Sequence, residues 1–513
     1  MQKGVHISIW NREVTIRKDQ EIGWSKDAGR TPKDGRGKHG NQKKLHEETR
    51  ESVRQHIRSF PTRVSHYSRI KNAERKYLHE NLNERRMWLI YLHTHEPAEL
   101  EKLRLRQKIN PKVKYWLYCD IFNHEFKLSF GLPRSDTCNT CDRLESEIKS
   151  HEKNGNEEEA NQARQQLDFH HRKAEKGYEV LREMTKTAQA GTIDMLTFDF
   201  QQNLPVPTLK NSDMFYARLL WTYNFRIHNC HDGSACMHLW LESIAKRGSS
   251  EVCSCLQHYF VTHPPKSRRL VLFSDGCGGQ NKNKMMFSYL LRLVKMNVFS
   301  RIDHYFLTRG HTFLPNDRDF GVIEKYKKGE MAYVPNDYQD ILRKARTVDP
   351  FEVVCMEKDD ILDYSTFCKQ TFKVASLKDL NSNTTAKIRK LMWFSYGQRE
   401  VFNIEDGSTE LVDHGDEIWG RCTLNNMESW MRFMPQKRGA NLLADIPKKY
   451  ADQTVRIKYA KYKDLMEKVV NSGILPDEYK EYYRNLPHDG PTAANHGNGD
   501  ESDYGSDGDD YVY

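Results

Sequence analysis

The order of strand and helix patterns between Thr192 and Lys328 restricts the fold more than any other feature of this sequence. Three strand patterns come first, and helix and strand patterns then alternate. The strand patterns are TIDMLTFDF, LLWTYNFRIHN, SACMHLWLE, RRLVLFSD and IDHYFLTRGH, and the helix patterns are SSEVCSCLQHYFV, NKMMFSYLLRLVKM and FGVIEKYKKG. The HDG turn signal after the second strand predicts that the first three strands form an antiparallel meander.

This order predicts an α/β fold with a ribonuclease H-like core, a mixed five-stranded sheet with flanking helices. The second strand alternates, with Trp221, Tyr223, Phe225 and Ile227 on one face, so we expect it to be half buried. The fourth is a continuous apolar run, typical of a central parallel strand. A Rossmann fold fits less well because no G-x-G-x-x-G follows the first strand, and GCGGQ at 276–280 lacks the Gly-Lys-Ser/Thr ending of a phosphate loop.

Three acids stand where such a core would bind metal ions. Asp199 lies in the first strand, Asp275 ends the fourth, and Asp317 follows the last strand at the entry to a helix. Phosphodiester cleavage by two Mg²⁺ (or Mn²⁺) ions requires carboxylate ligands, and we expect these three acids to supply them. Each acid alone also fits a structural role, as a strand-end, turn or helix-capping residue.

Other residues compete with or assist these acids. Glu324 is the main rival for the third position, Asp319 is a weaker one, and Glu251 and His311 are possible helpers. The glycines of the GCGGQ loop would allow a backbone to approach closely, and Asn281, Lys282 and Asn283 would then contact phosphates.

The amino-terminal part is strongly basic, with 13 Lys/Arg against 5 Asp/Glu between Lys26 and Lys71. This charge is the usual electrostatic signature of a nucleic-acid-binding protein, although a localisation signal has the same composition. The residues expected to contact DNA are Lys33, Arg36, Lys38, Lys43, Lys44, Arg50, Arg54, Arg58 and Lys282.

Cys138 and Cys141 form a C-x-x-C motif before a long charged segment that reads as a helical hairpin with KNGNEE at its tip. With no thioredoxin-like strand before it, the motif predicts half of a structural zinc site. We expect His170 to be the third ligand; His171, His151, His124 and Cys119 are candidates for the fourth. The alternative is two cysteines packed at the start of a helix.

The predicted organisation has six parts. These are a flexible basic arm (1–42), a helical DNA-binding region (43–113), a helical hairpin with a zinc site (114–190), the catalytic core (191–350), a mixed extension (351–484) and an acidic, disordered tail (485–513).

Several protein classes are excluded by composition. No run of about 18 apolar residues exists, so no membrane span is expected. The start of the chain has no apolar segment typical of a secretory signal. The 11 cysteines are too few and too scattered for a disulfide framework, which favours a reducing compartment.

Long motifs in the chain resemble a large, mostly uncharacterised animal family of transposon-derived, transposase-like proteins. The motifs are RGKHGNQ, SFPTRVSHYSR, PRSDTCNTC, FDFQQNLPVP, RGSSEVCSCL, SDGCGGQNKN and GHTFLPNDRDFGVIEK, and the similarity covers roughly residues 36–370. The resemblance implies a DDE/D ribonuclease H-like core with Asp199, Asp275 and Asp317 at the matching positions. Short, charged helical patterns in series before this core separately predict an all-helical amino-terminal region.

These observations together predict a nuclear, homo-oligomeric transposase-like protein that cleaves and joins DNA with Mg²⁺. A domesticated factor that binds DNA or a protein without cleaving it is the main alternative. A nuclease acting on RNA or on repair intermediates is a third, since this core serves many substrates.

Overall fold

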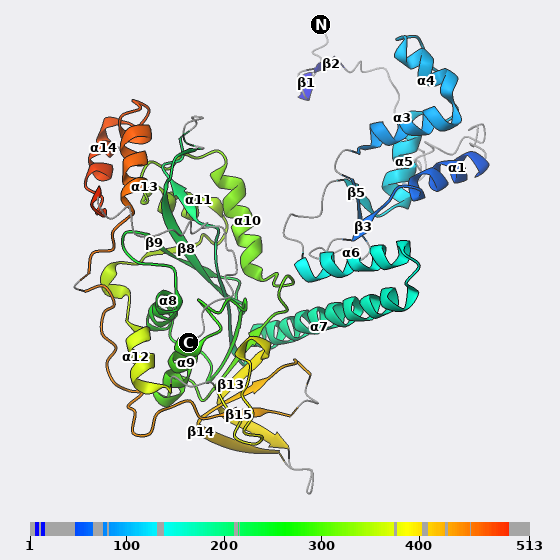
Figure 1. The fold of residues 1–513 in the computed structure, drawn as a ribbon. Coiled ribbons are helices and arrows are strands. Elements are labelled where there is room, and N and C mark those ends of the chain that lie inside the picture. The colour runs from blue at the N-terminus through cyan, green and yellow to red at the C-terminus, as the bar shows by residue number, and fades with distance from the viewer. Residues whose placement is uncertain are drawn as a thin grey trace, which may run out of the picture. The chain divides into compact units, whose positions relative to one another are not determined.

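The chain divides into two units, Met1–Pro133 and Arg134–Tyr513, each described here by itself. The computed structural model describes residues 6–9, 12–15, 47–64, 75–79, 82–130, 138–209, 214, 216–373, 377–402, 409–425, 429–451 and 453–491 (Figure 1). Most of the predicted basic arm and most of the predicted acidic tail lie outside these residues. Within them, no helix combines the length and the apolar character needed to cross a bilayer.

The first unit contains both helices and short strands. Its elements are β1 (His6–Ile9), β2 (Arg12–Thr15), α1 (Glu47–Arg58), β3 (Arg63–Val64), β4 (Lys76–Leu78), α3 (Glu84–His95), α4 (Pro97–Arg104), α5 (Tyr115–Glu125) and β5 (Leu128–Phe130). The core is formed by side chains such as Val53, Trp88 and Tyr118, from α1, α3 and α5. The strands β3, β4 and β5 pair into a small sheet, so the expectation of an all-helical region is wrong. Strands of two or three residues are too short to show an alternating pattern.

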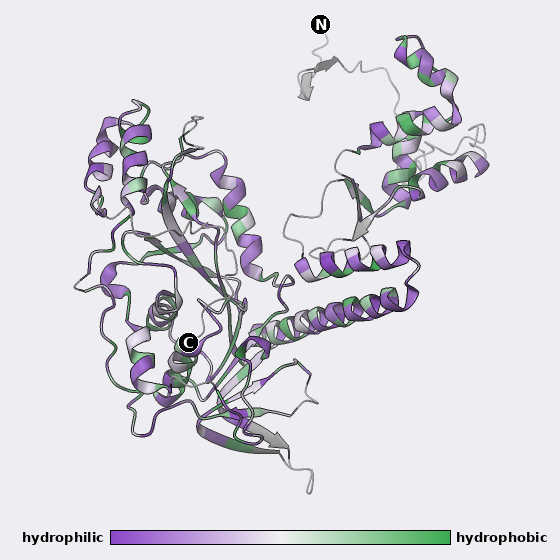
Figure 2. Ribbon diagram, in the orientation of Figure 1, coloured by the Kyte–Doolittle hydropathy of each residue, from purple (hydrophilic) through white to green (hydrophobic). Residues whose placement is uncertain are grey.

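The second unit begins with the predicted helical hairpin. It consists of α6 (Asn139–Lys153) and α7 (Glu157–Gln189), which lie side by side and are joined by a short turn at Gly155 (Figure 1). Three glutamates open α7, where the positive end of the helix dipole favours them. Figure 2 shows that hydrophilic residues predominate along both helices. The far end of α7 packs Val180 and Leu181 against the main sheet.

The main sheet has ten strands. They are β6 (Asp194–Phe200), β7 (Leu204–Val206), β8 (Leu220–Asn229), β9 (Ala235–Leu241), β10 (Arg269–Ser274), β11 (Arg301–Phe306), β12 (Glu352–Cys355), β13 (Trp393–Phe402), β14 (Thr409–Arg421) and β15 (Met431–Phe433). Their order is β12-β9-β8-β6-β10-β11-β13-β14-β15, with β7 paired to β8. The five predicted strands are adjacent in this sheet. The predicted sheet was too small because 351–433, predicted as part of a mixed extension outside the core, adds strands at both edges.

Strand directions follow the prediction. The strands β6, β8 and β9 form an antiparallel meander, and β10 lies parallel to both β6 and β11. A central parallel strand needs crossover connections, which are supplied by α8 (Ser249–Thr262) before β10 and α9 (Lys284–Lys295) before β11.

Helices cover both faces of the sheet. On one face Phe198 and Ile227 share a core with residues of α8, α9 and α12 (Tyr364–Thr371). On the other face, α7, α10 (Pro315–Lys327) and α11 (Asp337–Ala345) pack over the sheet together with α13 (Tyr459–Asp464), a π-helical turn (Leu465–Val470) and α14 (Asp477–Arg484). The described residues also contain two 3₁₀ turns, Lys358–Asp360 and Ile388–Lys390.

The strand β8 is buried on both faces, and the expectation of a half-buried strand is wrong. Its polar residues Thr222, Asn224, Arg226 and His228 lie on the face covered by α10 and are all buried. Hydrogen bonds and ion pairs replace water there: the Asn224 side chain donates to Gln201, and Arg226 pairs with Asp319. An alternating pattern shows that the two faces differ, but not that one of them meets solvent.

Candidate functional site

Asp199 and Asp275 lie at the same edge of the main sheet. The strands β6 and β10 are parallel neighbours in which Thr197 pairs with Phe273. Each aspartate lies two residues beyond this pair, and residues two apart in a strand project from the same face. The two carboxylates therefore lie side by side on the face that α10 covers.

Asp317 comes to the same edge from α10. It occupies the first turn of this helix, and its carboxylate accepts a hydrogen bond of 2.8 Å from the Leu314 amide. Asn316 holds the start of the helix on the sheet, because its side chain binds the Thr197 hydroxyl (2.5 Å) and the Arg226 carbonyl (3.2 Å). Asp317 is thus both a helix-capping residue and a neighbour of the β6 strand.

The charges of Asp275 and Asp317 both act on Asp199. Burial raises the pKa of Asp199 well above its usual value, and the negative charges of Asp275 and Asp317 raise it further. The Phe200 amide, which donates to Asp199 over 2.7 Å, opposes this shift. Like charges gathered in a partly buried place need a proton or a cation to offset them.

Arg247 is a member of the site that our sequence analysis missed. It belongs to the RGSS segment before α8, and its guanidinium lies 4.5 Å from the centre of the Phe200 ring. It donates to the Asn203 side chain over 3.0 Å, while its Nε is buried with no hydrogen-bond partner among the described residues. Burial lowers its pKa, which the charges of Asp199 and Asp275 raise. Its signals in the sequence were its place before a helix, which many surface arginines share, and its position at the start of the RGSSEVCSCL motif.

The loop after Asp275 supports that aspartate instead of presenting three phosphate ligands. The Asn281 side chain donates to the Asp275 carboxylate, and the Cys277 amide donates to it over 3.3 Å. Asn283 caps α9 by accepting a hydrogen bond from the Met286 amide. Two of the three polar residues therefore serve the loop and the helix that follows it.

Lys282 is buried, and the expectation that it contacts DNA is wrong. Its ammonium donates to the Arg389 carbonyl over 3.0 Å and lies 4.9 Å from the centre of the Phe306 ring. Burial, helped by the charge of Lys173, lowers the pKa of Lys282 to about 8. The sequence could not reveal this, since a lysine after a glycine loop usually faces solvent.

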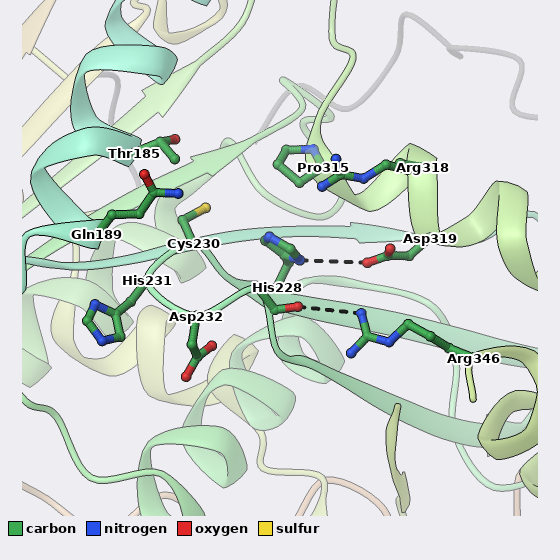
Figure 3. Close-up of a pocket in the computed structure, with 11 residues that line it drawn as sticks. Thr185, Gln189, His228, Cys230, His231, Asp232, Pro315, Arg318, Asp319 and Arg346 are labelled. Carbon is green, nitrogen blue, oxygen red and sulfur yellow. Dashed lines mark hydrogen bonds and ion pairs between the residues drawn. The ribbon is translucent and has the colours of Figure 1, made fainter. Parts of the chain in front are cut away.

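The three other acids considered as ligands have partners elsewhere. Asp319 forms a buried ion pair with Arg226, and its Oδ2 lies 3.6 Å from His228 Nδ1. Asp319 and His228 line a pocket together with Arg318 and Arg346 (Figure 3). Glu324 accepts hydrogen bonds of 2.8 Å from both Gln201 and Lys327. In the same way, Glu251 is buried and accepts hydrogen bonds of 2.6 Å from Lys449 and Tyr450.

Four cysteine and histidine side chains form a second cluster. Cys138, Cys141, His170 and His311 each place one ligand atom within 4.8 Å of all the others. Cys138 Sγ lies 3.2 Å from His170 Nε2, and Cys141 Sγ lies 3.3 Å from His311 Nε2. The structure thus places His311 beside the three residues that are expected to bind zinc. The sequence predicts His311 as a possible helper of the acids.

The other candidates for a fourth zinc ligand are distributed differently. His171 Nε2 lies 3.4 Å from Cys141 Sγ but does not meet the mutual distances of the cluster. His151 is in the last turn of α6, whereas Cys138 is the N-cap residue of that helix. Cys119 and His124 lie on α5 in the first unit.

The basic residues expected to bind DNA fall into two groups. Lys33, Arg36, Lys38, Lys43 and Lys44 lie outside the described residues. The arginines of α1 pair with acids of their own unit: Arg54 with Glu47 and Glu125 (both 2.5 Å), Arg58 with Glu51 (3.0 Å) and Arg50 with Glu125 (3.7 Å). A phosphate would have to compete with these carboxylates for the arginines of α1.

Comparison with family models gives a match to part of the chain. Residues 226–391 match a family described as a domain of unknown function (DUF7869). The matched residues include Asp275, Asp317 and His311. Asp199, Cys138, Cys141 and His170 lie before the start of the match. No curated protein matches the chain. No solved structure matches it either.

Proposed function

We propose that the second unit is a ribonuclease H-like, metal-dependent phosphodiesterase that cleaves and joins DNA, as the transposase-like motifs also suggest. The observation that carries this proposal is that Asp275 and Asp317 both act electrostatically on the partly buried Asp199 at one edge of the main sheet. The strand order β9-β8-β6-β10-β11, with its directions, supports it. In such a core the first and fourth strands and a covering helix supply the acids.

The three acids fit a site for two Mg²⁺ ions. All three are hard oxygen donors, and the raised pKa of Asp199 reflects its burial and the charges of Asp275 and Asp317, which divalent cations would offset. Asp199, on which both other charges act, would hold the ions together with Asp275 and Asp317. When bound, such ions lower the pKa of an attacking water and stabilise the leaving oxygen of a phosphodiester.

The residues around the acids have separate tasks in this proposal. Asn281 holds the Asp275 carboxylate, and the Leu314 amide holds that of Asp317, so both are oriented before any ligand arrives. Arg247, with its buried Nε, would bind an oxygen of the phosphodiester. Attack by water would cut one strand, and attack by the freed 3′-hydroxyl would join it to another.

Incubating the purified chain with supercoiled plasmid and Mg²⁺ or Mn²⁺ tests the proposal. We expect nicking that stops in EDTA and is lost in Asp275→Asn, while Glu251→Gln at the buried Lys449 pair serves as the acid-to-amide control. A wild-type chain that nicks neither DNA nor RNA would contradict it. DNA as substrate implies a nuclear location, and light scattering tests the expected homo-oligomer.

A non-cleaving DNA- or protein-binding factor is the second candidate. Asp275 and Asp317 both accept hydrogen bonds within their own segments, so each has a structural role that persists without catalysis. This candidate predicts that Asp275→Asn keeps every function of the chain. A chain that binds DNA but takes up no Mn²⁺ at the acids would favour it.

A further inference from the structure

We propose that Cys138, Cys141, His170 and His311 bind one Zn²⁺, and that this ion holds Asp317 in the acid cluster. The second half of this inference rests on the proposed function, and the first does not.

The donor set and its spacing fit zinc. Two thiols and two imidazoles are a common structural zinc set, and Zn–S distances of about 2.3 Å with Zn–N distances of about 2.0–2.1 Å put the ligand atoms of a tetrahedron about 3.3–3.8 Å apart. The two closest S–N pairs, at 3.2 and 3.3 Å, approach this spacing before any ion is placed. Both cysteines and His311 are buried, as expected for a closed site.

The four ligands come from three separate segments. Cys138 and Cys141 open α6, His170 lies in the middle of α7, and His311 lies in the loop between β11 and α10. The loop approaches α6 so closely that Gly310 touches Cys138, and the Cys138 thiol lies 3.6 Å from the Arg309 carbonyl. One ion at this place would join the helical hairpin to the sheet.

The loop that carries His311 also delivers Asp317. His311 forms a turn by donating its amide to the Thr308 carbonyl (2.8 Å), and Leu314, three residues further on, donates its amide to Asp317. Asn316 pins the other end of this segment to β6 and β8. The segment from His311 to Asp317 is therefore held at one end by the cluster and at the other by the sheet.

Asp199 and Asp275 are positioned by the main sheet. Asp199 is inside β6 and Asp275 directly follows β10, so the backbone hydrogen bonds of the sheet position both. Loss of zinc should therefore displace Asp317 selectively, and the acid cluster should lose one ligand rather than all three.

Metal content of the full-length chain tests the zinc site. Mass spectrometry of the purified protein should find one zinc per chain, and Co²⁺ exchange should produce thiolate charge-transfer and tetrahedral d–d bands. Cys141→Ser and His311→Ala should bind less than about one fifth of that zinc, whereas His311→Cys, which supplies another zinc ligand, should restore it. The matched controls Cys355→Ser, His151→Ala and His171→Ala should keep it. Full zinc in His311→Ala, or its loss in His171→Ala alone, would overturn the ligand set.

Binding of Mn²⁺ to the acids tests the positioning role separately. Calorimetry should show Mn²⁺ affinity about tenfold or more weaker in His311→Ala than in wild type, the size of effect usual for residues that orient metal ligands, and His311→Cys should restore it. Unchanged Mn²⁺ affinity in a zinc-free His311→Ala would refute positioning. If the wild type binds zinc but takes up no Mn²⁺ and cuts no DNA, the proposed function fails while the zinc site stands.

Discussion

Gly310 packs against Cys138, and its φ angle lies in a region that other residues rarely adopt. The φ angle of Gly310 is +76°, and a Cβ added there would lie 2.6 Å from Cys138 Sγ and 2.9 Å from its Cα. This contact sets how closely the loop that bears His311 approaches the start of α6. A side chain at position 310 would force the two segments apart.

Gly310→Ala should therefore lower stability. The strained φ and the overlap with Cys138 together should cost about 1–3 kcal/mol in the free energy of unfolding, measured by urea denaturation. Gly321→Ala is the control, since this glycine lies within α10 and an added Cβ would meet nothing within 4 Å. It should stabilise the chain by up to about 1 kcal/mol. Equal stability of the two variants would show that the loop accommodates a Cβ at position 310 without a loss of stability.

Asp199 should make the metal-free chain less stable as pH rises. An acid whose pKa is raised by folding stabilises the folded state most below its unfolded pKa, near 4, and that contribution is lost as pH rises through the raised value. Buried His228, whose pKa is lowered to about 3, acts in the opposite direction below pH 6.5. The informative quantity is thus the difference in unfolding free energy between wild type and Asp199→Asn, which should favour the variant increasingly as pH rises from the unfolded pKa towards the raised pKa. A constant difference over that range would contradict the raised pKa.

The same proton should compete with the metal. Below the raised pKa of Asp199, binding of a divalent ion must displace one proton, so Mn²⁺ affinity should rise about tenfold per pH unit. Calorimetry in buffers of different ionisation heat counts the released proton directly.

Asp317 and Glu324 should differ as the third acid. Asp317→Asn should abolish nicking while keeping the fold, because the amide oxygen can still accept the Leu314 hydrogen bond. Glu324→Gln should keep nicking, because Glu324 accepts hydrogen bonds from Gln201 and Lys327. The acid whose charge raises the pKa of Asp199, after burial and Asp275, is Asp317 and not Glu324. The plasmid assay with equal amounts of folded protein compares the two. An inactive Glu324→Gln with an active Asp317→Asn would exchange the two roles and leave the other acids in place.

Asp319 should matter for folding rather than for chemistry. Its removal leaves the fully buried Arg226 guanidinium without its carboxylate, which typically costs about 3–5 kcal/mol. Asp319→Asn should thus lower the midpoint of urea unfolding far more than Asp317→Asn does. A soluble Asp319→Asn variant that has wild-type stability but does not nick DNA would indicate that Asp319 is a catalytic acid.

Salt dependence should separate the two groups of basic residues. Replacing Lys33, Arg36, Lys38, Lys43 and Lys44 with glutamine should flatten the log–log plot of DNA affinity against salt by about 0.9 for each phosphate that the variant no longer binds. Replacing Arg50, Arg54 and Arg58 should flatten it less, since these arginines are paired with glutamates. Deleting the whole basic segment is a poorer test, because Val53 and Ile57 of α1 belong to the core of the first unit. Fluorescence anisotropy at several salt concentrations measures the slopes. An unchanged slope in the first variant would indicate that the basic arm serves as a linker.

Local patterns were enough to predict the main elements of the second unit. The apolar run before Asp275 marked β10, the alternation around Phe225 marked β8, and the charged residues around Gly155 marked the α6–α7 hairpin. The direction of β10 followed from the helices that precede and follow it. Chain order and periodicity act within a few residues, so a single sequence displays them.

The strands added at both edges of the sheet were not predictable in this way. The strands β13 and β14 contain polar residues such as Gln398 and Asp413, which pair with each other, and β13 joins the sheet by pairing with β11. The preference of a segment for a strand depends on its cross-strand neighbours and its burial, so a local pattern does not show which strands join a sheet.

The sequence by itself determined the candidate residues: the carboxylates of Asp199, Asp275 and Asp317, the C-x-x-C thiols and a histidine on α7. The tertiary structure alone decided which residues lie together. It placed His311 with the thiols, buried Lys282 against the Arg389 carbonyl and paired Asp319 with Arg226. Ligand sets and buried ion pairs join residues that lie far apart in the chain, and which of them meet depends on how the whole sheet packs against its helices, information that no local pattern contains.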